Sequence, residues 1–274
     1  MSAVKKLMNS IEQKKSMLCL GLDLDPKRLP EGWEESITSL CRFALDIIEA
    51  TSDIVAAYKP NLGFYEALGP DGMSLLKLIR SRIPEETVVI FDGKRGDIGS
   101  TAEFYAKACF ETYRADWATV NPYMGYDSIR PFVRYKDNGV FVLCLTSNPG
   151  ARDFQRLEFE GRPLYMHVAE RVAGWDKDNN CGLVVGATHP EQMVEIRRAA
   201  GDRPLLIPGV GTQGGDLERA VIDGTDHFKK PALINVSRSV LYASNKADYA
   251  EAARAIVEQL NGTINRLRTE PTPG

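Results

Sequence analysis

The sequence has no apolar run that approaches the roughly 20 residues needed to cross a bilayer. Residues 1–15 alternate lysines with apolar residues and lack the long hydrophobic segment of a signal peptide. The five cysteines are widely spaced, odd in number and free of any CxxC pair, which favours reduced core cysteines over a disulfide framework. These absences predict a soluble, cytoplasmic, globular protein.

An excess of one charge and a set of metal ligands are missing as well. The formal net charge of −3 gives no reason to expect nucleic acid or an acidic membrane surface as a partner. The three histidines are scattered without ligand spacing, so they predict no metal site. Asp23 and Asp25 could form a metal pair, but Asp23 is equally placed to bind a sugar hydroxyl.

The sequence does contain a regular alternation of short β-branched runs and amphipathic segments. Strands are predicted to begin near residues 18, 54, 87, 116, 140, 182, 204 and 232. Parallel strands need a crossover helix, and eight of them favour an α/β fold closed into a (β/α)8 TIM barrel over a doubly wound open sheet. Without a linker-like break, residues 1–268 are expected to form a single domain, with 269–274 as a disordered tail.

Helical patterns occupy the segments between these strands. Ser36 and Ser100 are predicted N-caps, the latter with Glu103 at capping-box spacing. The expected helices include residues 4–16, 36–50, 100–113, 163–174, 190–199, 214–222 and 246–261.

Residues 88–99 form the most informative stretch, because an apolar strand ends there in two aspartates and two cations. Three glycines predict a sharp turn after Phe91. Charges at the end of a buried strand are costly unless they are paired or used, which favours a functional site over a solvated turn. The active site of a TIM barrel lies at the C-terminal ends of its strands. The polar residues expected there are Asp23, Lys59, Asp92, Lys94, Asp97, Ser147, Gln213 and Arg238.

If Lys59 faces the third strand, then Lys59, Asp92, Lys94 and Asp97 form an alternating array. Each ammonium would keep its neighbouring carboxylates ionised, and each carboxylate would raise the pKa of the lysines. A lysine held charged suits stabilising a developing carbanion and then protonating it. The alternative is an ion-pair network that only orders the barrel mouth.

A second constellation follows the last two strands. Residues 208–216 are rich in glycine, and Arg238 comes shortly after the final strand. Loops at these positions commonly bind phosphate in barrels, and an arginine can contact phosphate oxygens in a bidentate manner. The alternative is a tight turn with a solvated arginine. Ser147 has no histidine at recognisable spacing and is not interpreted as a nucleophile.

Residues 92–98, Asp-Gly-Lys-Arg-Gly-Asp-Ile, resemble the Asp-x-Lys-x-x-Asp-Ile signature of the orotidine 5'-monophosphate decarboxylase family in its longer bacterial form. Residues 21–23, 58–61, 146–150, 208–215 and 237–239 also match that family, in its order and over almost the whole chain. The resemblance implies a cofactor-free, metal-free carboxy-lyase that converts orotidine 5'-monophosphate to uridine 5'-monophosphate (UMP) and CO₂, the last step of de novo pyrimidine synthesis.

The resemblance also implies roles for individual residues. Lys94 would stabilise and protonate the C6 carbanion, with Asp92 against the departing carboxylate. In a homodimer, Asp97, Ile98 and Thr101 would reach into the partner subunit's site. Asp23 and Lys59 would contact ribose, Ser147 the pyrimidine, and Gln213 and Arg238 the phosphate. The remaining expected substrate-binding residues are Pro208, Gly209 and Gly211.

Two alternatives and one structural expectation accompany this resemblance. A sugar-phosphate lyase of the hexulose-phosphate synthase kind shares the Asp-x-Lys-x-x-Asp pattern but uses Mg²⁺. A non-catalytic barrel that binds a phosphorylated ligand would need only the glycines and Arg238. The segment 151–163 is expected to help cover the site.

Overall fold

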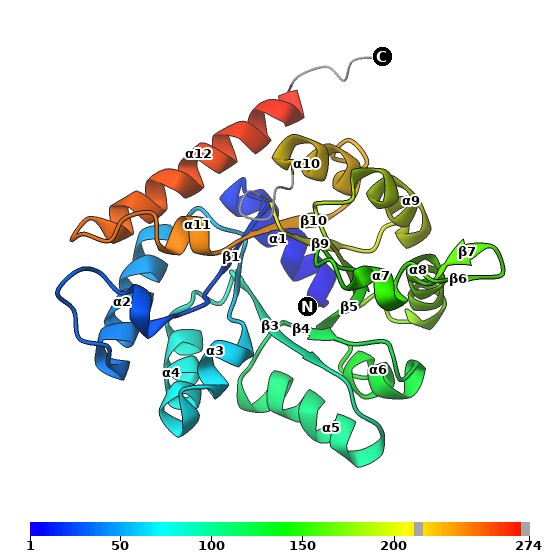
Figure 1. Ribbon diagram of the computed structural model, residues 1–274, viewed down its shortest axis with the longest axis horizontal. Coiled ribbons are helices and arrows are strands. Elements are labelled where there is room, and N and C mark those ends of the chain that lie inside the picture. The colour runs from blue at the N-terminus through cyan, green and yellow to red at the C-terminus, as the bar shows by residue number, and fades with distance from the viewer. Residues whose placement is uncertain (211–215, 270–274) are drawn as a thin grey trace.

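The computed structural model describes residues 1–210 and 216–269 of the protein. Parallel strands close into one barrel in the order β1-β10-β9-β8-β5-β4-β3-β2, and Figure 1 shows them at the centre of a ring of helices. The predicted TIM barrel is confirmed. Its strands are β1 (Leu18–Gly21), β2 (Ala57–Lys59), β3 (Val88–Arg95), β4 (Trp117–Val120), β5 (Gly139–Leu145), β8 (Cys181–Val185), β9 (Leu205–Pro208) and β10 (Ala232–Val236).

The helices follow the strands around the barrel, and a short hairpin of β6 (Glu158–Phe159) and β7 (Arg162–Pro163) lies at its periphery (Figure 1). Residues 270–274 of the predicted tail lie outside the described residues. The α-helices are α1 (Ala3–Lys14), α2 (Ile37–Thr51), α3 (Leu62–Glu66), α4 (Gly69–Arg82), α5 (Gly99–Lys107), α6 (Tyr126–Val133), α7 (Ala151–Phe154), α8 (Leu164–Trp175), α9 (Pro190–Ala200), α10 (Leu217–Thr225), α11 (Arg238–Leu241) and α12 (Tyr249–Thr269).

Local sequence explains some helix boundaries and not others. Ser36 caps α2 by accepting a hydrogen bond from the N–H of Ser39, as predicted. The predicted cap at Ser100 is wrong, because α5 begins one residue earlier, at Gly99, whose φ of +55° suits glycine. The helix predicted over 100–113 is present, but its last part, Ala108–Thr112, is π-helical and not α-helical.

Part of the barrel interior is filled by the aromatic side chains of Trp117 and Phe141. The rings of Trp117 and Phe141 stack with their centroids 4.4 Å apart. Gly139 and Gly182 leave room for them, because a Cβ at Gly139 would lie 2.2 Å from the Trp117 ring and one at Gly182 would lie 2.7 Å from Phe141. This packing makes the barrel a filled core, so that polar side chains can project only near its ends.

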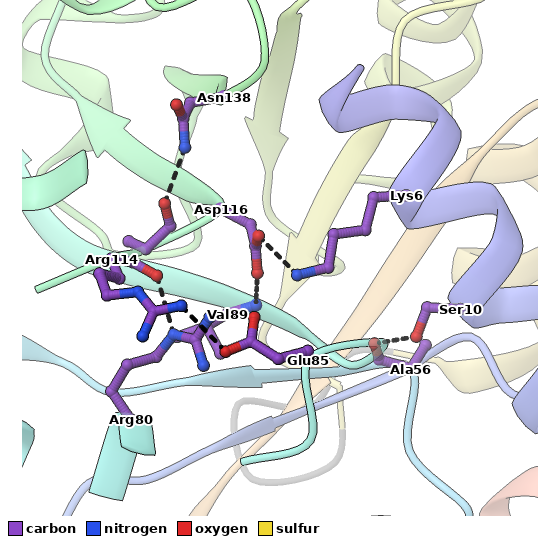
Figure 2. Close-up of polar contacts among 10 residues, drawn as sticks. Lys6, Ser10, Ala56, Arg80, Glu85, Val89, Arg114, Asp116 and Asn138 are labelled. Carbon is purple, nitrogen blue, oxygen red and sulfur yellow. Dashed lines mark hydrogen bonds and ion pairs between the residues drawn. The ribbon is translucent and has the colours of Figure 1, made fainter. Parts of the chain in front are cut away.

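Helix α1 lies at the N-terminal ends of the strands, and Figure 2 shows its Lys6 and Ser10 directed at Asp116 and Ala56, which directly precede β4 and β2. Lys6 Nζ lies 2.6 Å from Asp116 Oδ1, and Asp116 Oδ2 accepts a hydrogen bond from the N–H of Val89 at 2.8 Å. Ser10 Oγ donates to the carbonyl of Ala56 at 2.7 Å. These contacts fix α1 across the base of the barrel, which leaves the opposite end for a site.

The C-terminal helix α12 runs along the outside of the barrel and packs against α2 (Figure 1). In residues 1–210 and 216–269 we find no helix with both the length and the apolar character to cross a membrane.

Candidate active site

The predicted charged residues of β3 meet Lys59 of β2 at the C-terminal end of the barrel. Lys59 Nζ donates to Asp92 Oδ2 at 2.6 Å, and Lys94 Nζ donates to Asp92 Oδ1 at the same distance. One carboxylate therefore lies between two ammonium groups. Lys59 faces the third strand, as the array required.

Three of the four charged residues, Asp92, Lys94 and Arg95, lie in the strand itself, so the turn predicted directly after Phe91 is wrong. Strand β3 continues to Arg95, which pairs with Val120 of β4 beyond an irregularity in register. Lys94 has a φ of +44°, an uncommon backbone conformation for a residue with a Cβ. The irregularity aims Lys94 into the barrel mouth, where its side chain is 45% exposed.

The two lysines differ in how far their side chains are buried. The side chains of Lys59 and Asp92 are only 5% and 9% exposed. Burial by itself raises the pKa of Asp92, but the charges of Lys59 and Lys94 and their hydrogen bonds outweigh it and hold that pKa well below its usual range. For Lys59, burial lowers the pKa, and the nearby charges of Asp92 and Asp23 reverse the effect and raise it. Asp92 is therefore ionised and Lys59 protonated at neutral pH.

Thr119 of β4 also belongs to this cluster and was not among the site residues predicted from the sequence. Its hydroxyl donates to Asp92 Oδ1 at 3.0 Å and accepts a hydrogen bond from the backbone N–H of Lys94 at 2.9 Å. It thereby orients both the carboxylate and the unusual Lys94 backbone. The available signal was a single hydroxyl within the otherwise apolar and fully buried strand β4.

Asp23 follows β1 and lies at the same rim. Its Oδ2 accepts a hydrogen bond from Ser237 Oγ at 2.6 Å, while its Oδ1 is buried without a hydrogen-bond partner among the described residues. Asp25 instead caps the 3₁₀ turn at Pro26–Arg28 by accepting from the N–H of Lys27. The two carboxylates have separate local partners, and in the described ranges no group of three or more His, Cys, Asp or Glu side chains gathers as a metal site.

Ser147 follows β5, and its hydroxyl is buried with no hydrogen-bond partner in the part of the chain that the structure describes. The hydroxyl occupies space that Gly186 leaves beside it, because a Cβ at Gly186 would lie 2.2 Å from Ser147 Oγ. A buried hydroxyl without a partner costs free energy unless a ligand or water supplies one.

The structure does not join Asp97 to the cluster. Within the described chain Asp97 forms no ion pair with Lys59 or Lys94, and its carboxylate accepts a hydrogen bond from the N–H of Ile98. Ile98 is 56% exposed and Thr101 is also exposed. These three residues extend from the end of β3 into the start of α5.

Only some of the residues expected at the phosphate-binding end of the site lie within the described part of the chain. Pro208 is the last residue of β9. Gly209 follows it with a φ of +97°, which glycine adopts readily. Arg238 begins α11 and is exposed at the end of β10. Gly211 and Gln213 lie outside the described residues.

Arg95, to which no role was assigned from the sequence, links three elements. Its guanidinium forms an ion pair with Glu66 of α3 and lies 5.0 Å from the ring centroid of Tyr105 in α5. Gly93 permits the approach of α3, since a Cβ there would lie 2.7 Å from Leu62 Cδ1. These contacts hold the irregular end of β3 in place.

The closed barrel carries a buried carboxylate between two lysines at the C-terminal ends of its strands, and Ser147 after β5 has a buried hydroxyl with no partner among the described residues. This is the architecture of a (β/α)8-barrel enzyme. Residues 16–255 match the family described as "Orotidine 5'-phosphate decarboxylase / HUMPS family". Because this match covers most of the chain, the protein belongs to that family, and the resemblance noted in the sequence is confirmed.

Individual relatives agree with this assignment. The chain is 47% identical over 273 residues to "Orotidine 5'-phosphate decarboxylase" of Thermomicrobium roseum, covering 98% of this chain and 97% of that protein. It is 48% identical over 257 residues to the protein of the same name from Herpetosiphon aurantiacus, covering 93% and 95% of the two chains. The solved structure of Leishmania donovani OMP decarboxylase superposes with a TM-score of 0.84 at 37% identity, over 99% and 100% of the two chains.

Proposed function

We propose that this protein decarboxylates orotidine 5'-monophosphate to UMP and CO₂, the last step of de novo pyrimidine synthesis. The observation that carries the proposal is the Asp92 carboxylate held between Lys59 and Lys94 at the mouth of the barrel. Relatives at 47% and 48% identity carry this activity in their names.

Loss of CO₂ leaves the electron pair of the broken bond on C6 of the pyrimidine. In the proposed mechanism the Lys94 ammonium stabilises this charge and then transfers a proton to C6, and the resulting amine regains a proton from solvent. Asp92 would lie against the departing carboxylate. Its 2.6 Å contact with Lys94 Nζ also orients that ammonium before the reaction.

The rest of the nucleotide is assigned to the rim residues. Asp23 and Lys59 would contact ribose, and the buried hydroxyl of Ser147 would contact the pyrimidine. Phosphate would be bound by Pro208, Gly209, Gly211, Gln213 and Arg238. Binding energy from the phosphate, remote from the reacting bond, can be used to organise the site around the base. The expectation that segment 151–163 helps to cover the site stays a prediction.

We further infer a homodimer in which Asp97, with Ile98 and Thr101, reaches the partner subunit's site. Apolar side chains of this segment are exposed: Ile98 is 56% exposed, and Phe104, which lies in α5 with Thr101, is 72% exposed. Large apolar side chains exposed together are characteristic of a protein interface. A second subunit on this surface would bring its own Asp97 toward the Lys94 of its neighbour.

A cytoplasmic location is part of the proposal. All five cysteines lie within the described residues and are unpaired, and four of them are buried. Unpaired buried cysteines are typical of proteins kept in a reducing compartment.

The decisive experiment follows the absorbance change as orotidine 5'-monophosphate loses CO₂. We expect turnover by the unmodified protein and a loss of at least about a thousandfold in kcat for Lys94→Ala, because both charge stabilisation and proton transfer depend on that ammonium. Lys177→Ala, a change at an exposed lysine between α8 and β8, is the matched control and should retain activity. No turnover by the unmodified protein would reject the function.

Assays in excess EDTA separate this proposal from the magnesium-dependent sugar-phosphate lyase. The decarboxylase should retain full activity, whereas an enzyme that stabilises an enediolate through Mg²⁺ should lose it and recover on addition of Mg²⁺. A non-catalytic barrel would bind the nucleotide without any absorbance change.

A further inference from the structure

Thr146, the residue before Ser147, is held at each of its polar groups by other side chains. Its N–H donates to Gln155 Oε1 at 2.8 Å, and Gln155 Nε2 donates to its Oγ1 at 2.9 Å. Its carbonyl oxygen lies 3.2 Å from Nε2 of His189. Gln155 directly follows α7, and His189 directly precedes α9. Two loops at the rim therefore converge on the end of β5.

The contact with Arg156 decides which ring nitrogen of His189 carries the proton. A guanidinium NH₂ of Arg156 lies 3.0 Å from His189 Nδ1, and a guanidinium can only donate. Nδ1 is therefore the acceptor, which makes Nε2 the protonated nitrogen that donates to the carbonyl of Thr146. Burial lowers the pKa of His189, the hydrogen bond to Thr146 raises it, and the charge of Arg156 lowers it, with a net decrease.

Holding the Thr146 carbonyl fixes more than Thr146. The carbonyl of one residue and the N–H of the next share one planar peptide group, so the His189 contact sets the orientation of the peptide that enters Ser147. The Gln155 contacts fix the preceding peptide through the N–H of Thr146. Thr146 Oγ1 also lies 2.6 Å from Asn148 Oδ1, which ties the residue after Ser147 to the same network.

Ser147 itself is the member of this segment with no partner for its hydroxyl among the described residues. Its neighbours on both sides are held, and Gly186 leaves the hydroxyl a space that no larger residue would leave. The network therefore restrains the backbone of a hydroxyl whose own hydrogen-bonding capacity is left for something else.

We propose that Gln155 and His189 are positioning residues, which fix the Thr146–Ser147 backbone from two sides and so aim the Ser147 hydroxyl at the base of the bound nucleotide. The inference rests on the proposed function, because that proposal places a pyrimidine against Ser147. Both side chains bind Thr146, and in this proposal they do not contact the nucleotide directly. They act on base recognition through Ser147 and leave the ribose and phosphate contacts unchanged.

The test compares the dissociation constants of UMP, which has the base, and ribose 5-phosphate, which lacks it. Gln155→Ala and His189→Leu remove the contacts with Thr146. Gln155→Glu keeps an acceptor for the Thr146 N–H, and His189→Gln keeps a donor for the Thr146 carbonyl. Removing one such contact is expected to raise the dissociation constant of UMP about five- to tenfold and that of ribose 5-phosphate by less than about twofold. The conservative variants should stay within about threefold of the unmodified protein for UMP.

A double-mutant cycle with Ser147→Ala completes the design. If Gln155 acts through Ser147, then Gln155→Ala should change UMP binding by less than about twofold in the Ser147→Ala background. An undiminished effect there, or equal weakening of UMP and ribose 5-phosphate, would overturn the inference. These binding measurements do not need turnover, so a protein that binds UMP with this pattern but fails to decarboxylate would reject the proposed function alone.

Discussion

Lys59 and Asp92 form a buried ion pair in which Nζ lies 2.6 Å from Oδ2. The two side chains are only 5% and 9% exposed. Removing one member of a buried pair leaves the other charge without compensation, which costs more than the pair itself contributes. In this barrel the loss would be compounded, because the uncompensated ammonium of Lys59 would face a second cation, Lys94, across the vacated position.

We therefore expect Asp92→Asn to lower the free energy of unfolding by about 3–5 kcal/mol. The measurement is urea denaturation at pH 7 followed by circular dichroism. Asp137→Asn is the matched control, because the Asp137 side chain is 81% exposed and pairs with the N-terminal ammonium at the surface, and it should change stability by less than about 1 kcal/mol. Equal stabilities for the two variants would contradict the proposed strength of the pair.

The same pair predicts how stability depends on pH. The pKa of Asp92 is lowered in the folded protein, so its contribution is present above the unfolded pKa of about 4 and is lost as the pH falls below it. The pKa of Lys59 is raised, so its contribution is present below the unfolded pKa of about 10.4 and is lost as the pH rises through the folded value.

The measurement is the urea midpoint of the unmodified protein and of Asp92→Asn between pH 3 and pH 8. The difference between the two proteins should be constant from about pH 5 to pH 8 and should shrink below about pH 4, where the carboxylate is protonated in the unfolded chain. A difference that does not change over this range would show that Asp92 contributes no pH-dependent stability.

Gly186→Ala should disturb the site through Ser147. The new Cβ would lie 2.2 Å from Ser147 Oγ and 2.9 Å from its backbone nitrogen, so the Ser147 segment must shift. We expect at least about a tenfold rise in the KM for orotidine 5'-monophosphate, because a shift of 1 Å at a binding residue is costly. Gly174→Ala, in α8, is the control: among the described residues a Cβ there has no neighbour within 4 Å, and activity should be unchanged.

Lys6→Met should destabilise the protein without changing its chemistry. The substitution removes the 2.6 Å contact with Asp116, whose side chain is only 16% exposed, while the bond to the Val89 N–H remains. We expect a loss of about 1–3 kcal/mol in the free energy of unfolding and an unchanged kcat. A reduced kcat with normal stability would mean that α1 influences the site at the far end of the barrel.

Mixed dimers test whether Asp97 serves the partner subunit. Lys94→Ala and Asp97→Ala protomers should each be inactive alone, and mixing them after subunit exchange should restore about one intact site per hybrid dimer. The readout is decarboxylase activity against the ratio of the two variants, with exchange confirmed by differently tagged subunits. Confirmed exchange without recovered activity would show that Asp97 acts within its own chain or not at all.

The parts of the fold that the sequence predicted are those with a local cause. The apolar run at 88–91 and the cap at Ser36 were identified because β-branched composition and a hydroxyl before a helix act over a few residues. The turn expected after Phe91 and the cap expected at Ser100 failed, because pairing of Arg95 with Val120 extends the strand and Gly99 begins the helix.

The order of strands and helices, and the placement of Asp92 and Lys94 at a strand end, were determined by the sequence alone, since periodicity and composition belong to the chain itself. Only the tertiary structure decided that Thr119 binds Asp92 across 27 positions, that Gly186 makes room for Ser147, and that His189 reaches Thr146 across 43 positions. Such contacts depend on which strands are neighbours and on their register after the barrel closes. No local pattern in the chain encodes them.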